Sequence, residues 1–281
     1  SLDEANRGFV DALKERGYGP DKVEIEQENA QGDQSNLKTI VSRFKAEKPK
    51  LICAIATPAA QAAANEIKDI PIVGTAITDY TSAKLVQNDE RPGGNVTGVS
   101  DFAAMDAQME LAAKLIPQAK HVGLIYCSSE VNSEVQANQM KDYCKKHDLA
   151  VEERTVNNVN DIQQVAESLI GKVDYIYVPT DNTLASSIPT LMKITDANKI
   201  PVIVGADIMA KDGALAALSV DYYRLGKQTG ELAADILDGK VKPETSPIQH
   251  QKDYTIVINK QDAEILGLTI PEEIAKKANM V

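Results

Sequence analysis

Two stretches decide the fold: Ile70-Pro71-Ile72-Val73-Gly74-Thr75-Ala76, in the first half of the chain, is echoed by Ile200-Pro201-Val202-Ile203-Val204-Gly205-Ala206 in the second. Each has the pattern of a buried strand entered through a proline. A second echo precedes the first, because strands ending near Thr57 and Thr180 each lead into a helix. These spacings far exceed the ~20 to 50 residues of a solenoid repeat. The sequence therefore predicts two similar lobes, with chance similarity between buried strands as the alternative.

Short β-branched runs alternate with amphipathic helical stretches along most of the chain. This alternation is typical of parallel sheets covered by helices, so we predict an α/β protein, and with the repeat two similar α/β lobes. The predicted strands are Val23–Gln27, Leu51–Ala56, Pro71–Thr75, Val96–Val99, His121–Cys127, Val151–Val156, Tyr175–Val178, Pro201–Gly205, Ala214–Val220 and Tyr254–Ile258.

Composition limits the classes of function. The chain has 281 residues, of which 43% are hydrophobic and 25% charged, and its formal net charge is −11. A length of this size suggests two domains, and the charge argues against a nucleic-acid partner. No apolar run approaches the ~18 to 20 residues of a membrane span. Three cysteines, Cys53, Cys127 and Cys144, lie in apolar or helical contexts and are predicted to be free thiols.

Motifs for catalysis and metal binding are weak. The three histidines, His121, His147 and His250, are far apart and lie in no HxxxH or CxxC context. The glycines of Gly93-Gly94-Asn95-Val96-Thr97-Gly98 have the spacing of a phosphate-binding loop, but Val99 stands where that loop needs lysine, so a turn is predicted. We therefore predict no enzyme activity, no metal and no cofactor, and keep an α/β enzyme as an alternative.

Polar residues at the predicted strand ends are the candidate ligand contacts. In open parallel sheets, ligands bind outside the carboxyl ends of the strands, where helix N-termini present unpaired N–H groups. The candidates are Thr57, Gln61, Thr78, Asp79, Tyr80, Ser128, Ser129, Asn132, Thr180, Asp181, Asn182, Asp207 and Asp221.

Such a set suits a small zwitterion. Hydroxyls, amides and helix N-terminal N–H groups can bind a carboxylate, and aspartates can bind an ammonium group. The alternative for Thr57, Ser129 and Asp181 is that each caps its own helix, the commonest use of these residue types at such positions.

The chain resembles solute-binding proteins of ABC transporters with the periplasmic-binding-protein-like type I fold, in the group that includes tryptophan- and phenylalanine-binding lipoproteins. The resemblance extends over essentially the whole chain, and its most specific part is the run Pro92-Gly93-Gly94-Asn95-Val96-Thr97-Gly98-Val99-Ser100. Further matching motifs are Ala5-x-x-Gly8-Phe9-x-x-Ala12-Leu13, Ala56-Thr57-Pro58-Ala59-Ala60-Gln61, Thr78-Asp79 through Leu85-Val86 to Arg91, Pro179-Thr180-Asp181-Asn182 and Asp221-Tyr222-Tyr223-x-x-Gly226.

This resemblance implies a small amino acid held between the lobes, which close on it and deliver it to a membrane permease. A ligand that contacts both lobes favours the closed form. The contacts carried over from the family are Thr57, Gln61, Thr78, Asp79, Ser128, Ser129, Asn132, Thr180, Asp181, Asn182 and Asp207, with Asp181 as the ammonium partner. Tyr80 and Tyr126 either stack on an aromatic ligand or belong to the core and rim.

The resemblance also implies a domain organisation in which two Rossmann-like lobes are joined by a hinge. The N-terminal lobe is expected to comprise residues 1–100 and 223–281, and the C-terminal lobe residues 101–222, with crossings near Ser100–Phe102 and Val220–Tyr223 and a third candidate at Pro243–Gln251. Members of the group begin with a strand and loop ahead of the helix that starts here at Leu2, so we expect a segment before it. The expected protein is an extracytoplasmic monomer, free or lipid-anchored. A ligand-sensing domain of a lactose-repressor-type regulator shares the fold and is the alternative.

Overall fold

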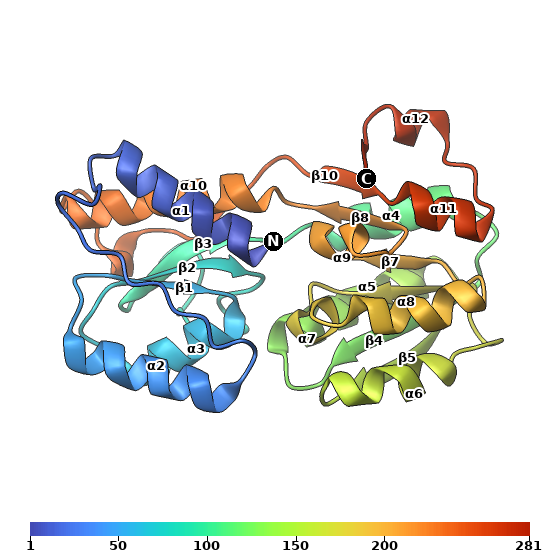
Figure 1. Ribbon diagram of the computed structural model, residues 1–281, viewed down its shortest axis with the longest axis horizontal. Coiled ribbons are helices and arrows are strands. Elements are labelled where there is room, and N and C mark those ends of the chain that lie inside the picture. Colours follow the sequence, from blue (N-terminus) through green and yellow to red (C-terminus); the bar gives the residue numbers. More distant parts are fainter. The chain divides into compact units, whose positions relative to one another are not determined.

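The computed structural model describes residues 1–281 and divides into two compact units. Unit 1 comprises Ser1–Phe102 and Asp221–Lys252, and unit 2 comprises Ala103–Val220 and Asp253–Val281. Each unit has its own parallel-rich sheet flanked by helices, so the predicted α/β class is confirmed (Figure 1). The prediction that residues 253–281 belong to the N-terminal lobe is wrong, because their strands and helices pack in unit 2.

Unit 1 is built on a four-stranded sheet of order β1-β2-β3-β9, in which every strand pair is parallel. Helices α1 and α10 lie on one side of this sheet and α2 and α3 on the other (Figure 1). The elements are α1 Leu2–Glu15, α2 Gln34–Glu47, β1 Ile52–Ile55, α3 Thr57–Glu66, β2 Ile72–Ile77, β3 Val96–Ser100, α10 Tyr222–Leu237, η2 Pro243–Thr245 and β9 Gln249–His250.

Unit 2 is built on a seven-stranded sheet of order β11-β10-β8-β7-β6-β4-β5, parallel except for the antiparallel pair β8–β10. The elements are α4 Met105–Leu115, β4 His121–Cys127, α5 Val131–Lys146, β5 Ala150–Val156, η1 Val159–Asp161, α6 Ile162–Glu167, β6 Tyr175–Val178, α7 Asn182–Ala185, α8 Ile188–Ala197, β7 Val202–Val204, α9 Asp207–Lys211, β8 Ala216–Ser219, β10 Thr255–Ile258, α11 Lys260–Leu266, α12 Glu272–Ala275 and β11 Asn279–Met280.

Both echoes of the sequence form matching elements. Residues 70–76 and 200–206 contribute the buried strands β2 and β7. The second echo gives β1 followed by α3 in unit 1, and β6 followed by α7 in unit 2. The repeat is therefore structural, because the first echo forms a buried strand in each sheet and the second forms a strand followed by a helix in each unit.

One predicted strand is wrong, and two short strands were not predicted. Residues 23–27 form neither a helix nor a strand, and residues 24–29 make no backbone–backbone hydrogen bond. A β-branched pattern forms a strand only beside a neighbouring strand, and none lies beside this segment. The two-residue strands β9 and β11 escaped prediction because a pair of residues carries no periodicity.

In unit 1, helix α1 is held against α10 by close backbone contact. A Cβ at Gly226 would overlap the carbonyl oxygen of Ala5, and one at Gly8 would overlap that of Tyr223. These glycines therefore let the two helices approach more closely than side chains would allow. Phe9 and Leu13 of α1 pack with Leu232 of α10 in one apolar cluster.

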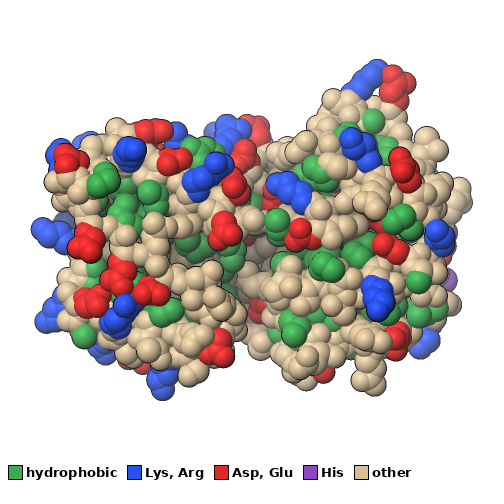
Figure 2. Space-filling view, viewed as in Figure 1, with side chains coloured by type: hydrophobic (Ala, Val, Ile, Leu, Met, Phe, Trp, Pro, Cys, Tyr) green, Lys and Arg blue, Asp and Glu red, His purple; other side chains and the backbone are tan.

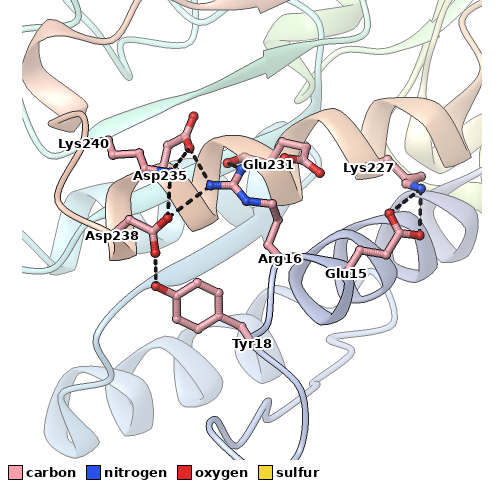
Figure 3. A network of polar contacts seen from close by, with 8 residues as sticks. All are labelled: Glu15, Arg16, Tyr18, Lys227, Glu231, Asp235, Asp238 and Lys240. Carbon is pink, nitrogen blue, oxygen red and sulfur yellow. Dashed lines mark hydrogen bonds and ion pairs between the residues drawn. The ribbon is translucent and has the colours of Figure 1, made fainter.

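A polar network ties the other end of this helix pair together (Figure 3). Arg16, which follows α1, bonds Glu231 at 2.6 Å, Asp235 at 2.8 Å and Asp238 at 3.1 Å. The hydrogen bonds that the guanidinium donates to Asp235 and Glu231 raise its pKa. Because these groups are largely solvated, the network contributes less to stability than the apolar packing beneath it.

The cysteines and the surface agree with the sequence. Cys53, Cys127 and Cys144 are unpaired, as predicted. No helix combines the length and apolar character needed to cross a bilayer. On the face shown in Figure 2, acidic and basic side chains are interspersed and basic ones do not gather into a patch.

Candidate functional site

At the strand-end edge of unit 1, the backbone itself has unusual geometry. Ala56, between β1 and α3, has φ 78° and ψ 153°, a conformation that is essentially restricted to glycine. Its N–H donates to the carbonyl of Thr75 at 3.0 Å. Helix α3 begins at Thr57, which is 2% exposed, so Thr57 is its first residue and Ala56 its cap. Ala76, where the β2–β3 register shifts, also has positive φ, 54°.

Thr78 belongs to a buried chain of polar groups. Its hydroxyl donates to Oδ1 of Asp101 at 3.0 Å, and the hydroxyl of Tyr222 donates to Oδ2 of the same carboxylate at 2.9 Å. Ser100 Oγ donates to the carbonyl of Thr78 at 2.8 Å. Burial raises the pKa of Asp101, and these two hydroxyl donors oppose the shift. This chain fixes the segments that follow β2 and β3.

The other predicted residues of unit 1 lie near the same edge without bonding one another. Gln61 Nε2 donates to the carbonyl of Ala83 at 3.2 Å, and Oδ1 of Asp79 accepts from the N–H of Ser82 at 2.8 Å. Tyr80 is fully buried, and its hydroxyl donates to the carbonyl of Val99 at 3.0 Å. Of the two predictions for Tyr80, stacking on a ligand or a place in the core, the structure shows the second.

In unit 2, two carboxylates hold the N-terminus of α7. Asp181 caps the helix through Oδ1, which accepts from the N–H of Leu184 at 2.8 Å. Glu130 comes from the turn before α5 and accepts from the N–H groups of Asn182 at 3.0 Å and Thr183 at 2.9 Å. The first three N–H groups of the helix are thus all bound by carboxylates, as the positive end of a helix favours.

Asp181 is also bound from the side of β4. Its Oδ2 accepts from the N–H of Cys127 and from Ser133 Oγ, both at 2.7 Å. Burial, followed by the nearby charge of Glu130, raises the pKa of Asp181 to about 7. The side chain is 1% exposed, so direct contact between this carboxylate and an ammonium group requires a local rearrangement.

Asn132 and Thr180 join this network. Nδ2 of Asn132 donates to Glu130 Oε2 at 3.0 Å and to the carbonyl of Thr180 at 2.9 Å. The N–H of Thr180 donates to Gln136 Oε1 at 3.0 Å, and the carbonyl of Asn132 accepts from Gln136 Nε2 at 2.9 Å. The structure therefore brings Asn132, Thr180, Asp181 and Asn182 together, with Glu130 at their centre.

The remaining predicted residues of unit 2 lie around this network. Ser128 and Ser129 are exposed at the end of β4, where their hydroxyls contact Asn157 Oδ1 at 3.0 Å and Cys127 Sγ at 3.2 Å. Ser129 does not cap α5, whose cap is Glu130. Asp207 begins α9 after β7 and pairs with Lys211.

Tyr126 is directed toward the edge strand β5. Its hydroxyl donates to Glu153 Oε1 at 2.7 Å, and Glu153 in turn binds Lys141 at 3.0 Å. Burial and this carboxylate raise the pKa of Tyr126 to about 12. Tyr126 is the penultimate residue of β4, and its hydroxyl is engaged by the edge strand, so stacking on a ligand at this strand end stays a prediction.

Sequence reasoning missed Glu130, Ser133, Gln136 and Asp101 as parts of these networks. Glu130 binds residues about fifty positions away, so no local spacing reveals its role. The run Ser128-Ser129-Glu130-x-Asn132 does, however, place an acid between the end of a predicted strand and the start of a helix. An acid at that position is a signal by which Glu130 could have been found.

One hollow in unit 1 is not part of either network. It has a volume of about 510 Å³ and lies at the C-terminal end of α10, between Leu232, Asp235 and residues 239–249. None of the predicted site residues lines it.

Comparison with known proteins identifies the family. The model of the family "ABC transporter substrate binding protein" matches residues 1–281. The chain belongs to this family, and its units have the architecture of type I periplasmic binding proteins.

Three relatives give more detail. A tyrosine-binding protein of Clostridioides difficile is 43% identical over 95% of this chain and 78% of its own length. The ABC domain of a Streptococcus pneumoniae protein, solved in complex with L-Trp, is 41% identical, with a TM-score of 0.96 over 100% of this chain and 95% of that one. A substrate binding protein with adhesive properties from Clostridium difficile, in its ligand-free, open structure, is 41% identical, with a TM-score of 0.77 over 100% and 94%.

Proposed function

We propose that this protein is the extracytoplasmic solute-binding component of an ABC importer and that its ligand is an aromatic amino acid. The observation that carries the proposal is the identity of 43% with a tyrosine-binding protein over 95% of the chain. The structure solved with L-Trp, 41% identical to this chain, supports the same class of ligand.

The strand-end edges supply suitable chemistry for such a ligand. Unit 1 presents the N-terminus of α3, whose partial positive charge suits a carboxylate. Unit 2 presents hydroxyls and amides around two buried carboxylates, which suit an ammonium group. We propose that Thr57, Gln61, Thr78 and Asp79 of unit 1 contact the ligand, together with the residues predicted in unit 2. A permease is the partner that follows from the family.

A thermal-melt panel tests this function on protein that is first unfolded, so that any carried ligand is released and washed away, and then refolded. The panel holds the twenty amino acids with sugar and purine controls. A ligand present at ~100 times its dissociation constant adds about 2.7 kcal/mol, which for this chain raises Tm by roughly 5 °C or more. We expect Tyr, Trp or Phe to raise Tm and the controls to leave it unchanged.

A flat amino-acid panel would contradict the proposal. The chain contains no Trp, so calorimetry is the confirming method and intrinsic Trp fluorescence is not. Recovery of the ligand unchanged after incubation distinguishes binding from turnover by an α/β enzyme. A regulator that shares the fold is less favoured, because the family model places the chain among transporter components.

A further inference from the structure

The chain passes between the two units three times. The crossings lie at Phe102–Ala103, Val220–Asp221 and Lys252–Asp253, so any motion of one unit against the other bends three connecting segments. These are called the first, second and third crossing segments in chain order. On the unit 1 side, each segment is joined to both of the others close to its crossing.

The first and third segments are joined through the sheet of unit 1. Strand β3 ends at Ser100 and β9 ends at His250, and these two residues are partners in a parallel register. Ser100 also fixes the residues that follow, because its hydroxyl accepts from the N–H of Phe102 at 3.0 Å and donates to the carbonyl of Thr78 at 2.8 Å. Both strands therefore end at the same level, directly before their crossings.

Two side-chain contacts join the second segment to the other two. The hydroxyl of Tyr222 donates at 2.9 Å to Oδ2 of Asp101, a carboxylate in the first segment that is 5% exposed. In the third segment, Gln251 bonds the backbone of Asp221 twice: Oε1 accepts from its N–H at 3.2 Å, and Nε2 donates to its carbonyl at 2.9 Å. The three segments are thus joined pairwise, and none of them can move against the others without breaking a contact.

Fewer contacts restrain the chain beyond these residues. Residues 251–254 make no backbone–backbone hydrogen bond. In unit 2 the second and third segments are neighbours, because Ser219 of β8 pairs with Thr255 of β10. The first segment has no such partner there, since the carbonyl of Ala103 accepts at 3.0 Å from Gln108 of the helix that follows it. Segments with few backbone hydrogen bonds open more easily than those that carry many.

We propose that these side-chain contacts form a clasp that holds the three crossing segments as one body with unit 1, so that bending between the units is confined to the few connecting residues beyond it. The clasp consists of Asp101, Asp221, Tyr222 and Gln251. The connecting residues are 103–104, 220 and 252–254. The inference goes beyond the proposed function, because it concerns the connections of the chain and holds for any ligand.

Hydrogen–deuterium exchange of the ligand-free protein tests the clasp. Tyr222→Phe removes a hydroxyl from a buried carboxylate, and we expect exchange at residues 99–102 and 248–251 to become about tenfold faster or more. The response at residues 248–251 measures transmission from the first segment to the third. Tyr223→Phe is the matched control, because this adjacent hydroxyl donates at 2.8 Å to Asp11 of α1 and belongs to no crossing segment contact. It should change both ranges by less than about threefold.

A second variant approaches the clasp from the third segment. Gln251→Ala removes both bonds to the backbone of Asp221, and we expect faster exchange at residues 99–102 as well as at residue 221. If each variant speeds exchange only beside its own lost bond, the three segments open independently and the clasp is wrong. Equal responses to Tyr222→Phe and Tyr223→Phe would also overturn it.

A measurement on the wild type needs no variant to fold. The N–H groups of Asp101 and Asp221 are bound, by the carbonyl of Ile77 at 3.1 Å and by Gln251, and we expect them to exchange at least about tenfold more slowly than residues 252–254. Equal rates would overturn the inference. Because no ligand is present, a flat amino-acid panel would contradict the proposed function and leave the clasp intact, whereas rapid exchange at Asp101 and Asp221 would contradict the clasp alone.

Discussion

The two units share a plan, yet they hold their strand ends by different means. Unit 1 combines unusual backbone geometry, with positive φ at Ala56 and Ala76, with hydrogen bonds from two hydroxyls to the single buried carboxylate of Asp101. Unit 2 relies on buried polar side chains, with Glu130 and Asp181 binding the first three N–H groups of α7. A fold of one type can therefore fix a binding edge through conformation or through charge, and the two solutions differ in their sensitivity to substitution and to pH.

The largest effect is expected from removing the central carboxylate of unit 2. Glu130→Ala leaves two backbone N–H groups and the side chains of Asn132, Asn182 and Thr183 without their acceptor. We expect a loss of about 3 kcal/mol in the free energy of unfolding, measured by urea denaturation. Glu134→Ala, exposed on the same helix, is the control and should stay within ~0.5 kcal/mol. Equal behaviour of the two variants would show that the network contributes little to stability.

In unit 1 the matching experiment adds a single methyl group. A Cβ at Gly226 meets the backbone of Ala5, which cannot move without displacing α1. We expect Gly226→Ala to destabilise the protein by about 2 kcal/mol through overpacking. Gly94→Ala is the matched control, because a Cβ there has open space around it. A neutral Gly226→Ala would mean that α1 shifts freely and that close helix contact is not what unit 1 depends on.

Unit 2 also contains a second buried acid pair, which makes its stability depend on pH. Asp196 at the end of α8 faces Asp262 of α11. Asp262 is 2% exposed, and neither of its oxygens has a hydrogen-bond partner. Burial, followed by the charge of Asp196, raises the pKa of Asp262 from 3.8 to about 7, and burial also raises the pKa of Asp196, opposed by Asp262 and Lys199.

The upward shift in the pKa of Asp262 sets the sign of the pH effect on stability. A carboxyl with a raised pKa holds its proton more tightly in the folded chain than in the unfolded one. Its contribution to the free energy of unfolding is therefore fully present below pH 3.8 and is lost as pH rises toward about 7. We expect the free energy of unfolding of Asp262→Asn to exceed that of the wild type by about 1 kcal/mol at pH 8 and by little at pH 4, allowing for partial solvent screening. Melting curves of both proteins across this range provide the measurement. A stability difference between the two proteins that does not change with pH would contradict the raised pKa of Asp262.

More of the fold than of the candidate site could be predicted from the sequence. Hydrophobic runs and the echoed prolines were enough to place β2 and β7, because burial of a parallel strand leaves a continuous apolar signal. Residues 23–27 show the limit, since strand formation depends on a neighbouring strand that a local pattern does not contain. The C-terminal residues 253–281 were assigned to the wrong lobe for the same reason: their pairing with β8 is long-range.

At the strand ends, sequence reasoning found the residues but not their partners. Asp181 could be placed at a helix start, and it does cap α7. That its other oxygen is held by Ser133 and the N–H of Cys127 depends on three segments meeting, which no spacing encodes. Residue type and position thus predicted the network's members in part, while the direction of each side chain required the fold.

The smallest expected effect tests whether unit 1 stores strain at its binding edge. Ala56 has φ 78° and ψ 153°, where a side chain is disfavoured and glycine is not. We expect Ala56→Gly to raise the free energy of unfolding by up to about 1 kcal/mol, because relief of strain exceeds the entropy that glycine adds to the unfolded chain.

Ala60→Gly, one turn further along α3 and fully buried, is the matched control and should lower that free energy by about 1 kcal/mol through ordinary helix propensity. Opposite signs for two identical substitutions in one helix would locate the strain at residue 56. Two losses of similar size would mean that this conformation is unstrained, and that the edge of unit 1, like that of unit 2, owes its shape to its contacts alone.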